Sequence, residues 1–391
     1  MPSTSPLSLI DTVHALTPQI EAAADDNEQA RRLSPLLAEA IAQAGLFRLW
    51  RPRSLGGEEL DAASFVRVVE AVSRIDGAAG WCVCIAGNTS LPCGRLPKQA
   101  AHEIFGSDPN IVTAGTWPPL GKAVVVDGGY QVTGRWPFAS GCHHSASIQS
   151  GCRIFDGDQP RLRADGTPIV RVVFFPAASC EILDTWYTAG MRGTGSHDFA
   201  VTDLFVPAAH TVSFQEPPVE PGPLYRLPIL GLSAAAISGV ALGIARHAID
   251  ILSEVARVKV GVRTQQVISQ HAVLQADLGR AEGLLRSGRA LLYETLDEVW
   301  QVAVARETLT IMQRAALSLA ATQAAQAAIQ TVDLMFSAGG SASLYASSRM
   351  ERCLRDIRTA GQHMAVVPAN YETFGQASLG LDVSANPMLR G

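Results

Sequence analysis

Apolar side chains recur at helical spacing through the first hundred residues. Residues Ile20 to Phe47 alternate acidic and apolar positions, and Ser34-Pro35 has the form of a helix cap followed by a proline in the first turn. A second apolar series runs from Phe65 to Val72, and a short segment from Leu96 to Gly106 has a proline near its start and a glycine stop. Residues 1–109 are therefore predicted to form an N-terminal helical domain.

The spacing of apolar residues changes to two between residues 110 and 212. Glycines and prolines separate four β-rich runs in this region, at residues 124–126, 130–133, 169–175 and 199–206. Alternation of this kind is typical of strands that bury one face. Residues 110–212 are predicted to form a central β-barrel or sandwich domain.

A proline-rich stretch at residues 213–229 cannot continue a helix or a central strand and is predicted to be a linker. Helical spacing then returns in three long segments, Ser233–Val260, Gln270–Ala305 and Leu309–Phe336. The last is rich in alanine and has no large polar side, so we expect it to be buried in a bundle. The order helical, β, helical predicts an α+β fold with a helical C-terminal domain at residues 230–391.

Composition restricts the class of protein. The 391 residues are 47% hydrophobic and 17% charged with a net charge of −5, and the charges are mixed along the chain, so no nucleic-acid surface is expected. The longest apolar run, Leu230 to Ala245, is too short to span a bilayer, and the N-terminus lacks a signal-peptide pattern. We expect a cytoplasmic protein without a membrane partner. Its seven scattered cysteines are expected to be reduced, mostly buried thiols.

The segment from Gly134 to His144 follows a strand–turn–strand pattern and combines two aromatic residues with a hydroxyl group. Trp136 and Phe138 could hold a planar redox-active ring while Ser140 bonds to its polar edge. The alternative is an ordinary hairpin whose aromatic residues fill the core.

Two glycine clusters allow close approach of the backbone to a ligand. The cluster from Gly190 to Asp198 precedes a strand, so it is not a dinucleotide fingerprint, and it could be a ligand loop or simply a tight turn. Gly339, Gly340 and Ser341 follow the alanine-rich segment, where they could end a helix or offer backbone amides to a phosphate.

His363 is the titratable residue best suited to chemistry, because an imidazole near neutral pKa can take a proton from a phenol or water. If the helix from Glu351 continues, Asp356 lies on the same face two turns earlier, and the pairs Glu351/Arg355 and Arg352/Asp356 are i,i+4 partners. The alternative is a surface histidine at a helix end.

No metal site is expected. His143 and His144 are adjacent, so on a strand they point to opposite faces, and no further ligand stands at a recognisable spacing. No signature of a hydrolase is present either.

Taken in order, these segments resemble the acyl-CoA dehydrogenase superfamily and, within it, the two-component flavin-dependent monooxygenases known as group D hydroxylases. The resemblance extends from about residue 20 to residue 380. It rests on the segments Ser73 to Trp81, Trp136 to His144, Arg192 to Ser196, Asp203 to Pro207 and Arg355 to His363.

The resemblance implies an N-terminal helical domain, a central β-barrel, a C-terminal four-helix bundle and a homotetramer, with flavin between barrel and bundle and a neighbouring subunit contributing. Residues implied at the flavin are Trp136, Phe138, Ser140 (near N5 and O4), Arg192, Thr194 and Ser196, with Gly339, Gly340 and Ser341 near its phosphate end. Residues implied at the substrate are Trp81, Asn88 and His143.

Position 363 separates the two branches of the superfamily. The dehydrogenases commonly have a catalytic glutamate about here, whereas His363 is similar to the histidine of the hydroxylases. Many hydroxylases also carry a second histidine where this chain has Asn88, and this departure leaves the substrate class open.

The implied function is an oxygenase component that hydroxylates an aromatic or polycyclic small molecule through a C4a-hydroperoxide of the flavin, with His363 and Ser140 as catalytic residues. Exclusion of water would prevent loss of peroxide. Reduced FMN is the expected cofactor, with FAD possible, and a separate NAD(P)H:flavin reductase is the expected partner. The alternatives are an FAD-containing acyl-CoA desaturase and a non-catalytic scaffold with the flavin fold.

Overall fold

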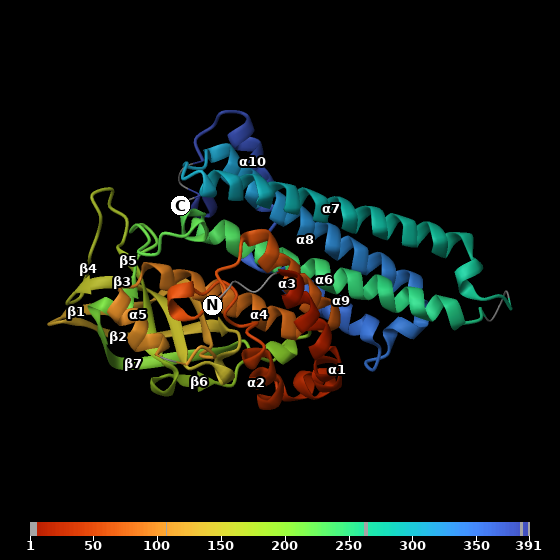
Figure 1. The fold of residues 1–391 in the computed structure, drawn as a ribbon, viewed down its shortest axis with the longest axis horizontal. Coiled ribbons are helices and arrows are strands. Elements are labelled where there is room, and N and C mark those ends of the chain that lie inside the picture. The colour runs from red at the N-terminus through yellow and green to blue at the C-terminus, as the bar shows by residue number, and fades with distance from the viewer. Residues whose placement is uncertain (1–5, 107, 262–264, 384–385, 390–391) are drawn as a thin grey trace.

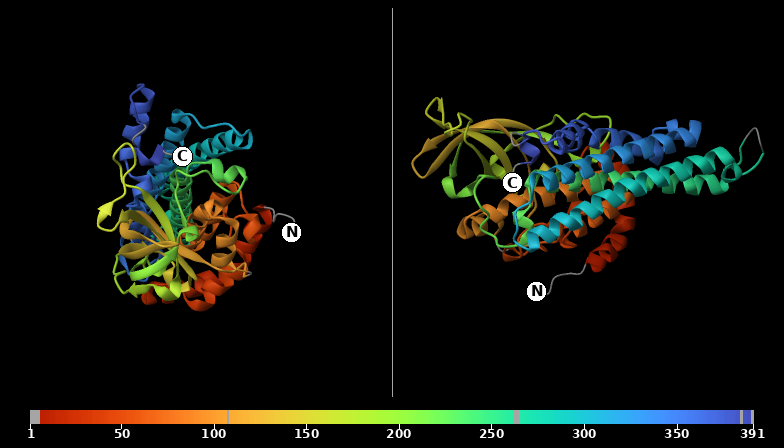
Figure 2. Two further views of the ribbon diagram at one scale, coloured as in Figure 1. Left: turned by 90° about the vertical axis from the view of Figure 1, so that its left-hand side faces the viewer. Right: turned by 90° about the horizontal axis from the view of Figure 1, so that it is seen from above.

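The computed structural model describes residues 6–106, 108–261, 265–383 and 386–389. Figures 1 and 2 show a curved β-sheet at one end of the molecule, long helices that extend away from it, and the N-terminal helices alongside both. Over the described residues, five helices precede the sheet and five follow it. The predicted α+β fold is confirmed.

Three of the five N-terminal helices, the second, third and fourth, begin at side-chain caps. The five helices are α1 (Pro6–Ala30), α2 (Pro35–Gln43), α3 (Ala62–Ile75), α4 (Gly77–Ser90) and α5 (Lys98–Phe105). Ser34 caps α2 as predicted, since its Oγ accepts from the N–H of Leu37 at 3.3 Å. Asp76 ends α3 and caps α4 through the N–H of Ala79 at 2.7 Å, so two helices meet at one carboxylate.

The pattern of apolar residues did not predict α4. Apart from the half-buried Ile85, every residue of this helix is buried, so it has no polar face to mark its period. Glycines allow it to pack tightly on α3: a Cβ at Gly87 would lie 2.3 Å from the ring of Phe65. The helix that carries Trp81 is thus held rigidly at the centre of the molecule.

The β region forms one eight-stranded mixed sheet. Its strands are β1 (Thr113–Val126), β2 (Gly129–Ala139), β3 (Ser147–Asp156), β4 (Gln159–Pro160), β5 (Val170–Pro176), β6 (Glu181–Leu183), β7 (His197–Pro207) and β8 (Thr211–Val212). The order is β6-β7-β2-β1-β3-β5-β8, with β4 on β3, and among the described strands only β1 and β3 pair in parallel. The predicted β1–β2 hairpin is present and turns at Gly128, whose φ is +75°.

Trp136 lies in the interior of the curved sheet. Its ring has no exposed surface, stacks on Phe199 at 5.0 Å, and donates from Nε1 to the carbonyl of Gly151 at 2.9 Å. A ring enclosed in this way has no face left for a ligand. The expectation that Trp136 contacts the cofactor is therefore wrong, and the core-filling alternative holds for this residue.

The C-terminal helices pack as a bundle around α6. They are α6 (Ile229–Val258), α7 (Ala272–Val304), α8 (Ile311–Gly339), α9 (Arg349–Ala360) and α10 (Ala369–Ser378), and the first three match the predicted segments within a few residues. The alanine-rich α8 is largely buried, as expected. Helix α6 is long and apolar enough to cross a membrane, but 89% of its most apolar stretch is buried inside the protein.

Six of the seven cysteines are buried and all seven are free thiols, as predicted. Burial raises the pKa of the Cys142 thiol to about 11 and that of Cys152 to about 12. Cys180, which is half-buried, also has its pKa raised to about 12 by burial. These groups stay protonated at physiological pH.

Candidate functional site

A chain of buried side-chain hydrogen bonds connects the N-terminal helices with the sheet. Trp81 Nε1 donates to Ser140 Oγ at 2.9 Å. Ser140 Oγ lies 2.6 Å from Ser196 Oγ, which lies 2.6 Å from Thr194 Oγ1. Thr194 Oγ1 donates to the carbonyl of Met191 at 2.8 Å. All five residues are buried, so this hydroxyl chain is a fixed element of the site.

The end of β2 positions Ser140 and leaves an aromatic ring uncovered. Phe138 has a φ of +67°, which is rare for a bulky residue, and its side chain is 62% exposed. The N–H of Ser140 donates to the carbonyl of Phe138 at 2.9 Å, and the N–H of Gly141 (φ +75°) donates to that of Thr194 at 3.0 Å. Strain that presents an apolar ring to solvent favours a binding role for Phe138.

The loop before β7 supports the edge of Phe138. The ring of Trp186 meets that of Phe138 edge-on at 6.2 Å, and the backbone N–H of Trp186 donates to His197 Nδ1 at 3.2 Å. Arg31, at the end of α1, pairs with Asp184 at 2.6 Å and covers the ring of Tyr187 at 3.9 Å. The loop whose Trp186 contacts Phe138 is thus joined to the N-terminal helices through Arg31.

The glycine-rich loop is anchored from α9. Met191 has a φ of +54°, and its N–H donates to Asp356 Oδ1 at 2.5 Å. Asp356 is buried, and burial raises the pKa of its carboxyl to about 7, with the N–H of Met191 acting in the opposite direction. The predicted pairing of Arg352 with Asp356 is wrong, because Arg352 binds Glu28 at 2.5 Å instead.

Arg192 stands apart from the hydroxyl chain. It lines a small cavity together with Glu28, Asp76, Arg352 and Asp356, and its Nε is buried without a hydrogen-bond partner in the part of the chain that the structure describes. Arg192 therefore lies beside buried carboxylates. Thr194 and Ser196 belong to the hydroxyl chain that reaches Ser140, whereas Arg192 does not.

His363 lies beside Trp81, and not on the helix that was predicted to carry it. Helix α9 ends at Ala360, so the expected shared face with Asp356 is wrong. The half-buried imidazole is 5.9 Å from the Trp81 ring, and its Nδ1 accepts from the N–H of Ala365 at 3.2 Å. Burial lowers the pKa of His363 to about 4. The ring is therefore neutral at pH 7 and carries its proton on Nε2.

Asn88 lies two helical turns beyond Trp81 on the same face of α4. It is 3% exposed, and its Oδ1 has no hydrogen-bond partner among the described residues, while Nδ2 is 3.7 Å from Cys84 Sγ. An unpaired buried acceptor is costly unless a donor joins it. Asn88 thus offers an acceptor to a bound molecule.

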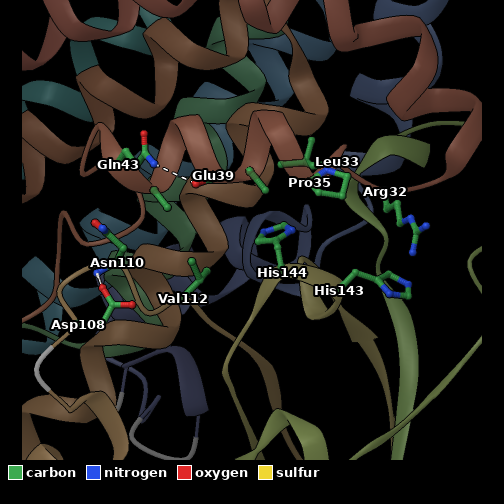
Figure 3. A pocket seen from close by; sticks show the side chains of 12 residues that line it. Arg32, Leu33, Pro35, Glu39, Gln43, Asp108, Asn110, Val112, His143 and His144 are labelled. Carbon is green, nitrogen blue, oxygen red and sulfur yellow. Dashed lines mark hydrogen bonds between the residues drawn. The ribbon is translucent and has the colours of Figure 1, made fainter.

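His143 is not brought to Trp81 or Asn88. It lies with Arg32 at one end of a cavity of about 490 Å³ between α2 and the sheet, whose lining does not include Ser140 or Trp81 (Figure 3). His144, in the same cavity, stacks on Phe47 at 5.2 Å.

The turn at Gly339 to Ser341 is also remote from Ser140 within one chain. It follows α8 at the end of the bundle away from the sheet (Figure 1). Gly340 has a φ of +65°, and both Gly340 and Ser341 are exposed. A role at the same site requires a second copy of the chain.

Sequence reasoning missed Met191, Trp186 and the anchoring role of Asp356. The glycines around Met191 indicated the loop. They did not indicate that the N–H of Met191 is bonded to Asp356. Nothing in the local pattern marked Trp186, because its contact with Phe138 depends on how two distant loops meet.

The chain resembles known proteins over nearly its whole length. The family described as acyl-CoA dehydrogenase, C-terminal domain, matches residues 235–368. The chain is 31% identical over 353 residues to the indole-3-acetate monooxygenase of Pseudomonas putida, covering 90% of this chain and 89% of that one. It is 27% identical over 386 residues to the flavin-dependent monooxygenase oxygenase subunit HsaA of Mycobacterium tuberculosis, covering 96% of both. XiaF from Streptomyces, solved with FADH2 and glycerol, superposes with a TM-score of 0.89 at 27% identity over 96% of both chains.

Proposed function

Because the chain belongs to the flavin-dependent monooxygenases with the acyl-CoA dehydrogenase fold, we propose that it is the oxygenase component of a two-component system that hydroxylates an aromatic or polycyclic small molecule. A separate NAD(P)H:flavin reductase supplies the reduced flavin, which activates O2 when bound. The observation that carries the proposal is the buried chain from Trp81 through Ser140 to Met191 beside the exposed ring of Phe138 and the neutral His363.

The residues present fit a flavin ring. Phe138 offers an uncovered aromatic face, and Ser140 offers a hydroxyl group that packing holds in place. XiaF, which holds FADH2, supports reduced FAD as well as the expected reduced FMN. Ser196 contacts the Ser140 hydroxyl directly and Thr194 contacts Ser196, so both hold Ser140 in place on the side away from the ligand.

His363 orients the substrate by donating a hydrogen bond. Its Nδ1 is occupied by the N–H of Ala365, so the free nitrogen Nε2 carries a hydrogen. A group with a pKa of about 4 is a weak base, and deprotonation of a phenol by His363 in the resting state is correspondingly disfavoured. Asn88 and Trp81 complete the substrate side, with the Asn88 oxygen accepting from a substrate hydroxyl or N–H group.

The similarity to indole-3-acetate monooxygenase supports an aromatic substrate. The buried acceptor at Asn88 favours one that carries a donor group. His143 belongs to the cavity beside α2, so we assign it no part in binding this substrate.

The proposed assembly is a homotetramer in the cytoplasm. The turn at Gly339 to Ser341 follows α8 at the end of the bundle away from the sheet, and a neighbouring subunit would bring its exposed amides to the phosphate end of the flavin.

The test is product formation from an aromatic acid or phenol with reduced flavin and O2. We expect hydroxylated product only when both are supplied. His363→Gln, which keeps an N–H donor, should retain at least tenfold more product per reduced flavin than His363→Leu. Product yield of the wild type should show no titration of His363 between pH 6 and 8, because its pKa of about 4 leaves it neutral throughout.

The outcomes separate the alternatives. Tight FAD on purification that is bleached by an acyl-CoA without oxygen would identify a desaturase. Failure to bind flavin in either redox state would favour the remaining alternative, a non-catalytic scaffold with the flavin fold. Equal yields from the glutamine and leucine variants would remove the donor role from His363.

A further inference from the structure

The cavity between α2 and the sheet is separate from the proposed flavin site, since its described lining includes neither Ser140 nor Trp81. Its volume of about 490 Å³ falls in the range of pockets that hold small organic molecules. Apolar side chains, among them Leu33, Ala38 and Val112, line its middle, and its two ends carry different polar groups (Figure 3). The cavity therefore suits a molecule with an apolar body and two unlike ends.

A positive charge lies at one end of this cavity. The guanidinium of Arg32 is beside His143 (Figure 3). No hydrogen bond or ion pair joins this guanidinium to another residue that the structure describes. A guanidinium without a partner can hold a carboxylate through two parallel hydrogen bonds. This end of the cavity therefore favours an acid group.

Carboxyl groups lie at the other end. Gln43 donates to Glu39 Oε1 at 3.0 Å, and the N–H of Asn110 donates to Asp108 Oδ1 at 2.8 Å. Each carboxylate keeps a second oxygen that can accept from a ligand. A second negative group on the ligand would be repelled here, which excludes dicarboxylates and nucleotides. A hydroxyl or N–H donor is favoured instead.

His144 connects the cavity with Ser140. Its imidazole lines the cavity and stacks on Phe47 at 5.2 Å, and burial lowers its pKa to about 4, so the ring is neutral at pH 7. The same ring lies against Gly141, where a Cβ would be 2.8 Å from His144 Nε2. Gly141 follows Ser140, and its N–H donates to the carbonyl of Thr194 at 3.0 Å. A molecule that contacts His144 thus acts on the backbone that positions Ser140.

His143 provides a second connection to the flavin site. Its ring meets that of His197 edge-on at 5.0 Å. His197 Nδ1 accepts from the N–H of Trp186 at 3.2 Å, and Trp186 meets Phe138 edge-on. A ligand in the cavity therefore restrains, by two routes, the segments that carry Phe138 and Ser140.

We propose that this cavity is a second binding site, for an aromatic acid with one carboxylate and a hydrogen-bond donor at its other end. The carboxylate binds Arg32, and the donor reaches Asp108. A planar body fits best, because the neutral imidazole of His144 gives an aromatic group a ring to pack against. An occupied cavity tightens the binding of reduced flavin, and reduced flavin tightens the binding of the acid by the same factor. Only this coupling rests on the proposed function.

Crystals grown with 5-bromoindole-3-acetate test the site, because the anomalous scattering of bromine locates the acid. We expect a bromine peak in the cavity, beside Val112, separate from any peak beside Trp81 and Asn88. No peak in the cavity would overturn the second site.

Titration calorimetry of the flavin-free protein tests the same site in solution. Arg32→Gln should raise the dissociation constant of indole-3-acetate at the cavity by about tenfold or more. Ala42→Phe, which fills the cavity without removing a polar group, should abolish this binding. The matched control is Arg257→Gln at the exposed end of α6, which should bind the acid like the wild type. Equal affinities in the wild type, Arg32→Gln and Ala42→Phe would overturn the proposal.

Anaerobic titration of reduced FMN and FAD tests the coupling. At an acid concentration that fills the wild-type cavity, indole-3-acetate should tighten the binding of reduced flavin about fivefold more in the wild type than in Arg32→Gln. Equal effects in the two proteins would overturn the coupling. A protein that binds the acid in the cavity but binds no flavin would remove the proposed function and leave the second site in place.

Discussion

Phe138 shows how a single residue combines strain with recognition. Its left-handed backbone costs free energy, and its exposed ring gains little from folding. Neither feature stabilises the isolated chain. Both are accounted for if the ring is covered when a ligand binds.

Phe138→Gly therefore separates stability from binding. Glycine adopts this φ without strain, so the free energy of unfolding should be unchanged or higher, by up to about 1 kcal/mol. Loss of the ring should raise the dissociation constant for reduced flavin at least tenfold. Urea unfolding and anaerobic titration measure the two effects, and a variant that binds flavin like the wild type would remove Phe138 from the site.

Elements with a clear period could be predicted from the sequence, and elements without one could not. The three long helices and the β1–β2 hairpin have regular apolar spacing and clear turn residues, and their positions were close. Helix α4 is buried on all sides, so its composition carried no period. Strand β3 includes the buried polar residues Gln149 and Ser150, which interrupt the alternation that marks a strand.

Asp356 in α9 allows a prediction about pH. Its carboxyl pKa is raised in the folded protein from an ordinary 3.8 to about 7, so the folded state binds a proton that the unfolded state releases. This stability is present below about pH 4 and is lost as the pH rises through 7. Asp356→Asn keeps an acceptor for Met191 without the charge. The unfolding free energy of the wild type should therefore fall by about 2–3 kcal/mol relative to that of the variant between pH 5 and pH 8.

Urea unfolding at both pH values measures this effect. Asp333→Asn is the control, because Asp333 of α8 pairs near the surface, at 2.5 Å, with Arg358 of α9, the helix that also carries Asp356. If the unfolding free energies of both variants change between pH 5 and pH 8 by the same amount as that of the wild type, the buried carboxyl of Asp356 does not set the pH dependence of stability.

At the scale of the whole molecule, the site is assembled from segments that are far apart in the sequence. Trp81 comes from α4, Ser140 from the end of β2, Met191 from the loop before β7, and Asp356 from α9. Motifs identified several of these residues. Their connection into one chain depends on the packing of all layers, which no local pattern contains.

The turn at Gly339 to Ser341 leads to a prediction about assembly. Phe138→Ala removes the aromatic ring of the proposed flavin site. Gly340→Val distorts the turn proposed for the phosphate end, because valine does not readily adopt the φ of +65° at this position. If the turn acts on a neighbouring subunit, unfolding and refolding the two variants together should restore up to half of the flavin sites of mixed dimers. Mass-resolved flavin titration of the mixture checks this, and no recovery would place the turn outside the site.

The buried cysteines bear on how the protein withstands its own chemistry. An oxygenase whose turnover is not fully coupled to substrate releases hydrogen peroxide, which oxidises thiolates much faster than thiols. Cys142, two residues from Ser140, is enclosed and remains protonated, as does Cys152 in the sheet. The protein can therefore tolerate repeated unproductive cycles without sulfenic acids accumulating beside its own site.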